Sequence, residues 1–310
     1  MRLTIIGCSG SMSGPKSPAS SYLVQAEGES PEGGTRTYSL LLDIGPGAMG
    51  HLLRYLDPAA LDAIAISHLH ADHCADLVGM QVYRKWNPYG ALGPVPVYSP
   101  EDGHKRMLQL SGDDPEDTYE GEYEFHRIRA GDSFTVGPMH VEVFAALHTV
   151  EAVAFRITGP AEASKIPPAI TRAPMLADFS TTTSLPAIRP ASTTALPAGA
   201  PQPRETLAQP GRQMVLTYTG DTDLCESQIA AAKDADFLLA EAAYQDGREK
   251  VRGVHMTGGR AGKLARMAGV KRLGLTHLQP WTQPAEILRE VRGEYAGPAS
   301  CVAAGEVYRI

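Results

Sequence analysis

The sequence lacks the apolar segments and cysteine motifs of a secreted or membrane-bound protein. Its first residues run straight into a strand-like stretch, and no apolar run there is long enough for a signal peptide. No apolar segment elsewhere is long enough to span a bilayer. Only four cysteines are present and none forms a C-x-x-C pair, so neither a zinc knuckle nor a disulfide framework is indicated. We expect free thiols, a cytoplasmic location and no membrane partner.

The sequence also has fewer basic than acidic residues. The chain of 310 residues has 28 Lys and Arg against 35 Asp and Glu, which gives a formal net charge of −7. An acidic surface repels polyphosphates, so nucleic acid is a disfavoured partner, whereas a small anionic substrate is not. The hydrophobic content of 43% is ordinary for a globular protein and is enough for a sizeable core.

Strand-like and helix-like segments mix along most of the chain, which favours an α/β fold in one domain over residues 1–310. An apolar strand over 63–67 precedes a helix predicted over 73–86, with Asp72 as its N-cap. Residues 89–103 are rich in turn-forming residues, and no strand is predicted there.

The segment 160–212 interrupts this pattern. It contains ten of the 24 prolines, many Ala, Ser and Thr residues, and almost no aromatic residues. A stretch of this composition buries too little apolar surface to fold alone. We therefore predict a Pro-rich arm or disordered insert that interrupts the single domain.

The strongest chemical signal is the run H-L-H-A-D-H at residues 68–73, directly after an apolar strand. Because side chains two residues apart on an extended segment point to the same side, His68 and His70 share a face. Asp72 and His73 then turn into the start of a helix and bring a carboxylate and a third imidazole to the same place. Four such groups so close together suit two adjacent metal ions better than a protein core.

Three more candidate ligands, His148, Asp221 and His277, each follow a predicted strand. The carboxyl ends of strands are where α/β proteins place functional loops. With the earlier run, these positions resemble the metallo-β-lactamase superfamily, including a Gly-Asp-Thr motif at 220–222. The resemblance implies an αββα sandwich with two divalent metal ions at the edge between its sheets.

Carried over to this chain, the resemblance implies a ligand set for each ion. One ion would be held by His68, His70 and His148, the other by Asp72, His73 and His277, and both by a bridging Asp221. Asp43, in a D-x-G-x-G turn, would support these ligands from behind. Imidazole and carboxylate groups suit zinc, and manganese or iron is also compatible.

Two further motifs resemble the phosphodiesterase branch of this superfamily: L-A-E-A, which contains Glu241, and H-M-T, which begins at His255. The resemblance implies that His255 protonates the leaving oxygen and that Glu241 orients His255. In the mechanism that we expect, the two ions share an attacking hydroxide, and Asp72 accepts its proton. The simpler alternative is that Glu241 only ends a strand and His255 only lies on a loop.

Residues 7–11 (G-C-S-G-S) and 276–282 (T-H-L-Q-P-W-T) resemble the actinobacterial cyclic AMP phosphodiesterases of this fold. The resemblance implies a phosphodiesterase that hydrolyses 3′,5′-cyclic nucleotides, cyclic AMP giving 5′-AMP, and acts as a homodimer. A non-catalytic binding module is a further alternative, which the complete set of ligand residues disfavours.

The other enzymatic alternative is a tRNA 3′-processing endonuclease. The insert at 160–212 lies where those enzymes carry a tRNA-gripping arm. However, residues 15–21 lack the Arg-Asn pair that they have after the first strand. The insert also holds only five basic residues against three acidic ones between Ala161 and Arg212, which is a poor phosphate clamp.

Overall fold

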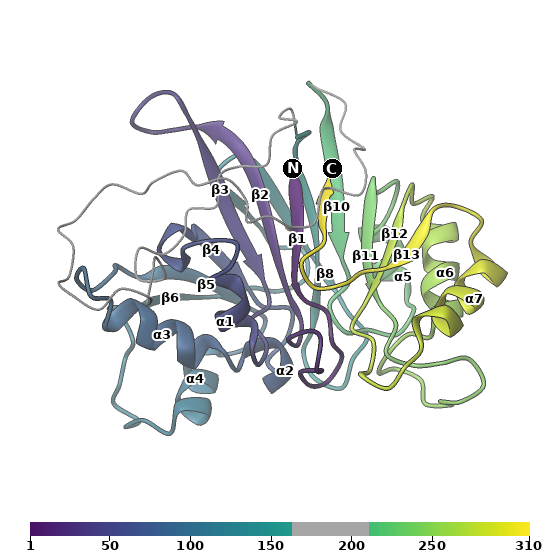
Figure 1. Cartoon of the computed structure of the whole chain (residues 1–310), viewed down its shortest axis with the longest axis horizontal. Coiled ribbons are helices and arrows are strands. Elements are labelled where there is room, and N and C mark those ends of the chain that lie inside the picture. Colours follow the sequence, from purple (N-terminus) through teal and green to yellow (C-terminus); the bar gives the residue numbers. More distant parts are fainter. Residues whose placement is uncertain (163–210) are drawn as a thin grey trace, which may run out of the picture.

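Two β-sheets lie face to face, and helices cover the outer surface of each sheet (Figure 1). The computed structural model describes residues 1–162 and 211–310. The layers of helix, sheet, sheet and helix confirm the predicted αββα sandwich in an α/β domain. The arm or insert predicted over 160–212 falls almost entirely outside the described residues.

The first sheet comes from the N-terminal half of the chain and is completed by its last strand. In order across the sheet, the strands are β14 (Val307–Arg309), β1 (Arg2–Gly7), β2 (Ser21–Glu29), β3 (Thr35–Leu42), β4 (Ala63–Ala65), β5 (Val95–Ser99) and β6 (Tyr123–Arg127). β14 to β3 pair antiparallel, whereas β3 to β6 run parallel. The parallel strands therefore end at a common edge.

The second sheet comes from the rest of the chain. In order across the sheet, the strands are β13 (Ala299–Cys301), β12 (Leu273–Thr276), β11 (Phe237–Glu241), β10 (Gln213–Tyr218), β9 (Val153–Pro160), β8 (Met139–Ala145) and β7 (Ser133–Val136). β10 to β13 are parallel, and β7 to β10 are antiparallel. This sheet thus repeats the arrangement of the first, with a parallel half whose strands share one end.

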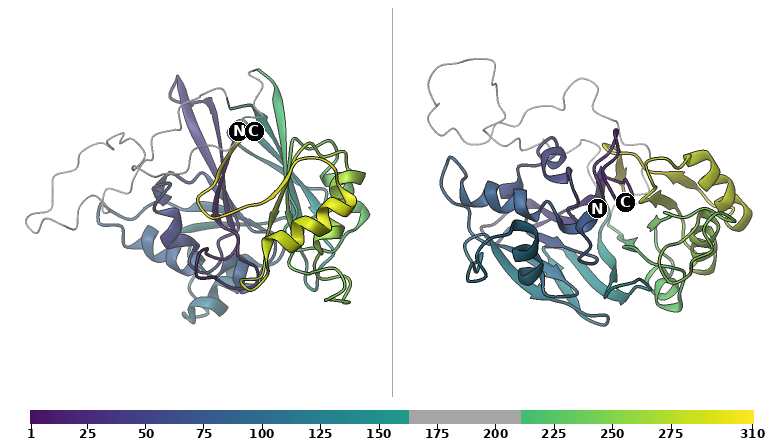
Figure 2. Two further views of the ribbon diagram at one scale, coloured as in Figure 1. Left: turned by 45° about the vertical axis from the view of Figure 1, so that its right-hand side comes forward. Right: turned by 90° about the horizontal axis from the view of Figure 1, so that it is seen from below.

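Helices form the two outer layers, as the views in Figure 2 show. Those beside the first sheet are α1 (Ala48–Leu52), α2 (Ala71–Cys74), α3 (Leu77–Lys85) and α4 (Gly103–Ser111), with a 3-10 turn at Pro58–Ala60. Those beside the second are α5 (Glu226–Ala231), α6 (Gly258–Met267) and α7 (Pro284–Glu294). Among the described residues, no helix is both long enough and apolar enough to cross a membrane.

The strands are apolar on both faces because both faces are covered. Leu40 and Leu42 of β3 belong to the core between the sheets, whereas Leu41 belongs to the core beneath the helices of the first sheet. Neighbouring residues of a strand point to opposite faces, so one uninterrupted apolar run serves two cores. A third apolar cluster lies between the second sheet and its helices, with Leu238 and Leu264 among its members.

The start predicted for the helix over 73–86 is wrong. The chain forms two helices, α2 and α3, separated by Ala75 and Asp76. Asp72 lies inside α2, whose N-cap position is His70. The carboxylate of Asp72 faces Nε2 of His73 at 3.4 Å instead of capping backbone N–H groups, so it is directed towards the candidate site.

Residues 89–103, predicted without a strand, contain the whole of β5. This strand pairs in parallel with both β4 and β6, so its partners come from distant parts of the chain. The local sequence does not predict this strand, because Pro96 lies in the middle of β5 and Gly93-Pro94 precede it. The helix α5 was not predicted either.

The ends of the undescribed segment lie next to each other. β9 and β10 pair antiparallel up to Pro160 and Gln213, and the N–H of Ala161 donates to the carbonyl of Arg212 at 2.9 Å. Residues 160–162 and 211–212, which fall within the bounds predicted for the insert, therefore belong to the described sheet region. The two termini also adjoin, since β14 pairs with β1 (Figures 1 and 2).

Candidate metal centre

Polar side chains collect where the parallel strands of both sheets end. Asp43 directly follows β3, and His68 lies three residues beyond β4. In the second sheet, Asp221 lies three residues beyond β10, Glu241 is the last residue of β11, and His277 directly follows β12. Because the carboxyl ends of parallel strands share an edge, the fold brings residues far apart in sequence close together.

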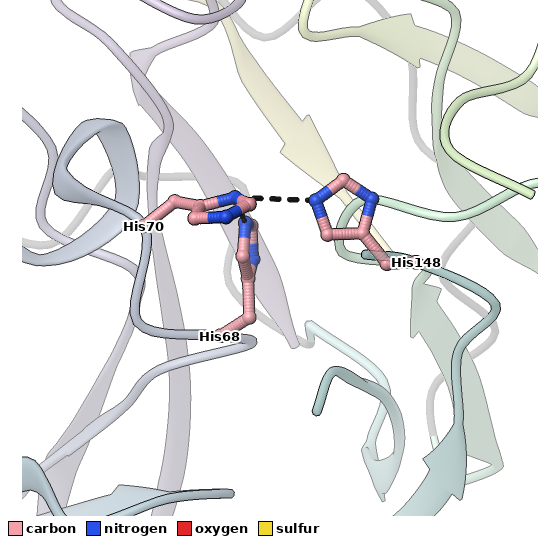
Figure 3. Close-up of side chains that lie close together, drawn as sticks. All are labelled: His68, His70 and His148. Carbon is pink, nitrogen blue, oxygen red and sulfur yellow. Dashed lines mark hydrogen bonds between the residues drawn. The ribbon is translucent and has the colours of Figure 1, made fainter. Parts of the chain in front are cut away.

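Three histidines form the first cluster (Figure 3). Nδ1 of His70 lies 2.9 Å from Nε2 of His68 and 3.2 Å from Nε2 of His148. His68 and His70 come from the loop after β4, and His148 reaches across from the loop after β8. The three nitrogens converge on a single point, which is the geometry of an imidazole site for one transition-metal ion.

Two carboxylates and two imidazoles form the second cluster, which consists of Asp72, His73, Asp221 and His277. Oδ2 of Asp221 is 3.3 Å from Nε2 of His73 and 3.3 Å from Nε2 of His277. The same oxygen is 3.8 Å from Nε2 of His68 in the first cluster. Asp221 therefore lies between the two clusters, where a bridging carboxylate would have to be.

Two buried polar atoms of the second cluster have no hydrogen-bond partner among the residues that the structure describes: Nε2 of His73 and Oδ1 of Asp221. An unpaired buried polar atom is costly, and such atoms are rare in folded proteins. A cation at each cluster would satisfy both atoms, and imidazole with carboxylate is a donor set that divalent ions accept. The residues at the site therefore fit the two divalent ions that the fold family implies.

Neighbouring groups hold the imidazole rings from behind. The Nδ1 of His73 lies 2.7 Å from Oδ2 of Asp43, which also accepts a hydrogen bond from Tyr218 at 2.6 Å. The Nδ1 of His148 faces the carbonyl of Val254 at 2.8 Å. Such contacts at Nδ1 leave Nε2 free to face a metal, as is usual for metal-binding histidines. The supporting role predicted for Asp43 thus has a geometric basis.

His277 is held in the same way from the first sheet. Its Nδ1 lies 2.9 Å from Oγ of Ser20, and its Nε2 accepts a hydrogen bond from the N–H of Ser11 at 3.2 Å. Its backbone has a left-handed φ of 56°, which is uncommon for a residue other than glycine. Contacts with the first sheet therefore fix the ring of this candidate ligand, and an ion bound at Nε2 would take the place of the hydrogen bond from Ser11.

The electrostatics favour the metal-binding forms of Asp221 and His68. Burial raises the pKa of Asp221, but His277 and His73 outweigh burial and hold this pKa well below its usual value. Burial also lowers the pKa of His68 well below its usual value. An ionised carboxylate and a neutral imidazole are the forms that bind cations. The buried ring of His73 differs, because Asp221 and Asp43 raise its pKa well above the usual value despite burial.

Two glycines leave the space that the ligand loops need. A Cβ at Gly45 would lie 1.9 Å from the carbonyl oxygen of Asp72, so the turn after β3 can approach the ligand loop only with glycine there. Gly220 has a φ of +58°, and a Cβ there would lie 2.7 Å from the carbonyl oxygen of Val153. The glycines of both motifs are therefore explained by close approach of backbone.

His255 and Glu241 form a buried pair beside the clusters. Nδ1 of His255 lies 3.0 Å from Oε1 of Glu241, and the backbone N–H groups of Thr222 and Ala243 also donate to this carboxylate, at 2.9 and 3.0 Å. Burial alone would lower the pKa of His255, but the carboxylate of Glu241 raises it to about 9. The ring centroid of His255 lies 5.6 Å from that of His277. A protonated imidazole can therefore be held next to the candidate ions.

The sequence did not indicate a structural role for Asp223. This residue is fully buried and binds the loop that carries His255. Its Oδ2 accepts from Nε of Arg252 at 2.6 Å and from the N–H of Gly253 at 2.9 Å. Its Oδ1 accepts from Nη1 of Arg260 at 2.5 Å. The only sign of this role in the sequence is that Asp223 directly follows the Gly-Asp-Thr motif. No neighbouring residue indicates which groups Asp223 binds.

A family model described as the beta-lactamase superfamily domain matches residues 38–214 of this chain. The chain is 29% identical over 317 residues to the uncharacterized protein Rv1339 of Mycobacterium tuberculosis, covering 100% of this chain and 92% of that protein. It is 28% identical over 265 residues to a ribonuclease Z of Myxococcus xanthus, covering 84% of each. The crystal structure of the metallo-beta-lactamase fold protein YhfI from Bacillus subtilis covers 100% of this chain and 99% of its own, with a TM-score of 0.72 at 22% identity.

The chain therefore belongs to the beta-lactamase superfamily. Its fold, together with the two His/Asp clusters, is that of a metallo-hydrolase of this superfamily, related to YhfI and to ribonuclease Z.

Proposed function

We propose that this protein is a phosphodiesterase with two divalent metal ions, and that its substrates are 3′,5′-cyclic nucleotides. The observation that carries the proposal is the position of His255. Its ring lies beside both candidate metal clusters, with centroids 5.2 Å from His148 and 5.6 Å from His277. A general acid in this place is of use when the leaving group is a poor one, such as the alkoxide of a phosphodiester.

In the proposed ligand set, His68, His70 and His148 would hold one ion, and Asp72, His73 and His277 would hold the other. Asp221 would be a ligand of both ions. When bound, the ions supply an activated water and neutralise charge on the phosphate. Zinc is the ion we expect from these donors, and manganese or iron is compatible with them.

The residues of the chain carry the proton transfers in the proposed mechanism. Glu241 binds Nδ1 of His255, so Nε2 is the atom that donates a proton to the departing 3′ oxygen. The raised pKa of His255 keeps that proton in place at neutral pH. Asp72 accepts the proton that the attacking water loses. Cyclic AMP would give 5′-AMP by this route.

A second candidate function is RNA 3′-end processing. It is favoured by the likeness to the ribonuclease Z of Myxococcus xanthus, at 28% identity over 84% of each chain. It is disfavoured by the net charge of −7 and by the absence of an Arg-Asn pair in residues 15–21. We therefore place cyclic nucleotides first.

One comparison of substrates separates the two functions. The purified protein, supplied with zinc or manganese, is incubated with cyclic AMP and, separately, with a 3′-extended tRNA precursor. We expect 5′-AMP from the first and no cleavage of the second. Cleavage of the precursor without turnover of cyclic AMP would replace our proposal with the RNA alternative.

Two further features belong to the proposal. The four cysteines are free thiols in the structure, which suits the reducing cytosol that we expect as its location. We also expect a homodimer, which sedimentation of the purified protein would test. In the domain organisation that we propose, residues 1–310 form one hydrolase domain, and the arm or insert predicted over 160–212 interrupts it.

A further inference from the structure

A cavity of about 580 Å³ adjoins the candidate metal centre on the side of the first sheet. Its lining includes His70, the start of α4 and the end of β6. Nδ1 of His70 faces the other histidines, at 2.9 Å from His68 and 3.2 Å from His148. The opposite edge of the same ring is therefore the part available to the cavity. A molecule bound at the metal ions could therefore extend into this cavity.

The charged groups around the cavity are of both signs, and only some are paired. Arg127 donates to Glu151 at 3.0 Å, and the carboxylate of Asp102 accepts from the backbone N–H of Lys105 at 2.9 Å. The ammonium of Lys105 and the carboxylate of Glu101 have no recorded partner among the described residues. Arg106, also in the lining, donates from Nη1 to Oε1 of Gln109 at 3.2 Å. Lys105 and Glu101 therefore offer a donor group and an acceptor group that are free for a ligand.

We propose that this cavity binds the nucleoside part of the substrate. The cavity would then be the substrate-recognition site of the proposed phosphodiesterase, so this inference rests on the proposed function. Its volume lies within the usual range for small-molecule sites, about 300–1,000 Å³, and is sufficient for one nucleoside. The edge of a nucleobase carries donors and acceptors side by side, so a free ammonium and a free carboxylate complement it. The carboxylate of Glu101 accepts from an exocyclic amino group, and Lys105 donates to a ring nitrogen or carbonyl.

A second phosphate is a poorer occupant of this cavity than an uncharged nucleoside. The lining carries three cationic groups and three carboxylates, namely Lys105, Arg106, Arg127, Glu101, Asp102 and Glu151. Their formal charges balance, so the cavity has no net positive charge that would attract a further anion.

The test compares a substrate that has a nucleobase with one that has none. Glu101→Gln and Lys105→Ala are each assayed with cyclic AMP and with methyl p-nitrophenyl phosphate. We expect the KM for cyclic AMP to rise about tenfold relative to the KM for the simple diester, the factor of one hydrogen bond to a charged group. The kcat values should change far less, because neither side chain contacts the reacting atoms.

A panel of bases sharpens the test. In Glu101→Gln, the KM should rise for cyclic AMP and cyclic CMP, which have an exocyclic amino group, more than for cyclic UMP, which has none. Glu32→Gln and Lys263→Ala are the matched controls, since both side chains are exposed and lie outside the cavity lining. Both controls should leave every KM unchanged.

The failure of this proposal is distinguishable from failure of the proposed function. Equal changes in KM for both substrates, or no change for either, would overturn the nucleoside site while hydrolysis of cyclic AMP continued. If the wild-type protein hydrolysed only the simple diester, the proposed substrate would be wrong. The cavity would then be tested by inhibition of that reaction: 5′-AMP should inhibit, and about tenfold more weakly in Lys105→Ala. Equal inhibition of both proteins would overturn the site.

Discussion

The rings of the candidate metal site are oriented by side chains that face no metal themselves. Asp43 holds Nδ1 of His73 at 2.7 Å, and Ser20 lies at 2.9 Å from Nδ1 of His277. Both Asp43 and His277 have a left-handed φ of 56°. A backbone conformation of this kind persists in residues other than glycine only when the surroundings enforce it. The ligand geometry is thus set in advance of metal binding.

Replacing His255 by Ala should remove the general acid and leave the candidate ligands in place. We expect kcat for cyclic AMP to fall at least about 100-fold, because its leaving group is a poor one. Turnover of bis(p-nitrophenyl) phosphate should fall much less, since p-nitrophenolate leaves without protonation. Steady-state kinetics with both substrates measure the difference, and His126→Ala is the control because His126 is half-exposed and lies outside the site. Equal losses with the two substrates would argue against a general acid.

Replacing Asp223 by Ala should destabilise the protein, because it leaves the guanidinium group of Arg260, whose side chain is 13% exposed, without its carboxylate. Removing one partner of a buried pair typically costs about 3 kcal/mol or more. Urea unfolding at neutral pH measures this loss. The matched control is Glu294→Ala, whose pair with Arg266 is exposed on both sides and should contribute under about 1 kcal/mol.

The same substitution has a pH dependence of known sign. Burial opposes ionisation of Asp223, but Arg252 and Arg260 lower its pKa below the usual value. Its stabilising contribution is therefore complete above the pKa of an unfolded aspartate, about 3.9, and decreases as the pH falls towards the lower folded pKa. The stability difference between wild type and Asp223→Ala should shrink below about pH 4. A difference that grew on acidification would contradict the ion-pair assignment.

At the scale of elements, the site depends on where strands end. The sequence predicts the strands that precede His68, Asp221 and His277. The first is a continuous apolar run over 63–66, whereas the other two also contain polar residues. In each case a candidate ligand follows the strand within a few residues. The sequence does not predict β5, because its partner strands stabilise a segment that has turn-forming residues. It also gives no sign of the bonds between Asp223 and residues 252–260, since those contacts join segments 29 to 37 residues apart in the sequence.

The junction between β9 and β10 should tolerate removal of the undescribed segment. Residues 163–210 are deleted and replaced by a short glycine-rich turn. Because Ala161 and Arg212 are already hydrogen-bonded at 2.9 Å, closing the chain there requires no change in either strand. We expect the midpoint of thermal unfolding to change by only a few degrees, as measured by circular dichroism. A chain that failed to fold would show that the segment belongs to the core of the domain.

Activity of the deletion variant decides the role of the segment. Unchanged hydrolysis of cyclic AMP would leave residues 163–210 a linking or docking role. Loss of hydrolysis in a folded variant would place the segment in substrate binding.

At the scale of the whole molecule, the candidate metal centre joins the two halves of the sandwich. His68 and His70 come from the loop after β4 of the first sheet, and Asp72 and His73 come from α2, which follows that loop. The other candidate ligands, His148, Asp221 and His277, come from loops of the second sheet. Ions held by both sets would link the sheets at their common edge, and they would stabilise the folded state because the unfolded chain has no such site.

Removal of metal should therefore lower the stability of the entire domain. A chelator such as EDTA is expected to lower the midpoint of thermal unfolding by several degrees, and added zinc should restore it. Differential scanning calorimetry measures both changes. An unfolding midpoint that is the same with chelator and with zinc would mean that no ion links the two sheets.

The most direct measurement is the metal content of the purified chain, determined by elemental mass spectrometry after zinc is supplied and the excess removed. We predict two transition-metal ions per wild-type chain and a large loss in Asp221→Ala, whereas Asp132→Ala, outside both clusters, should retain both ions. A folded wild-type protein that retained no metal, or an Asp221→Ala variant that retained two ions, would contradict the two-metal site.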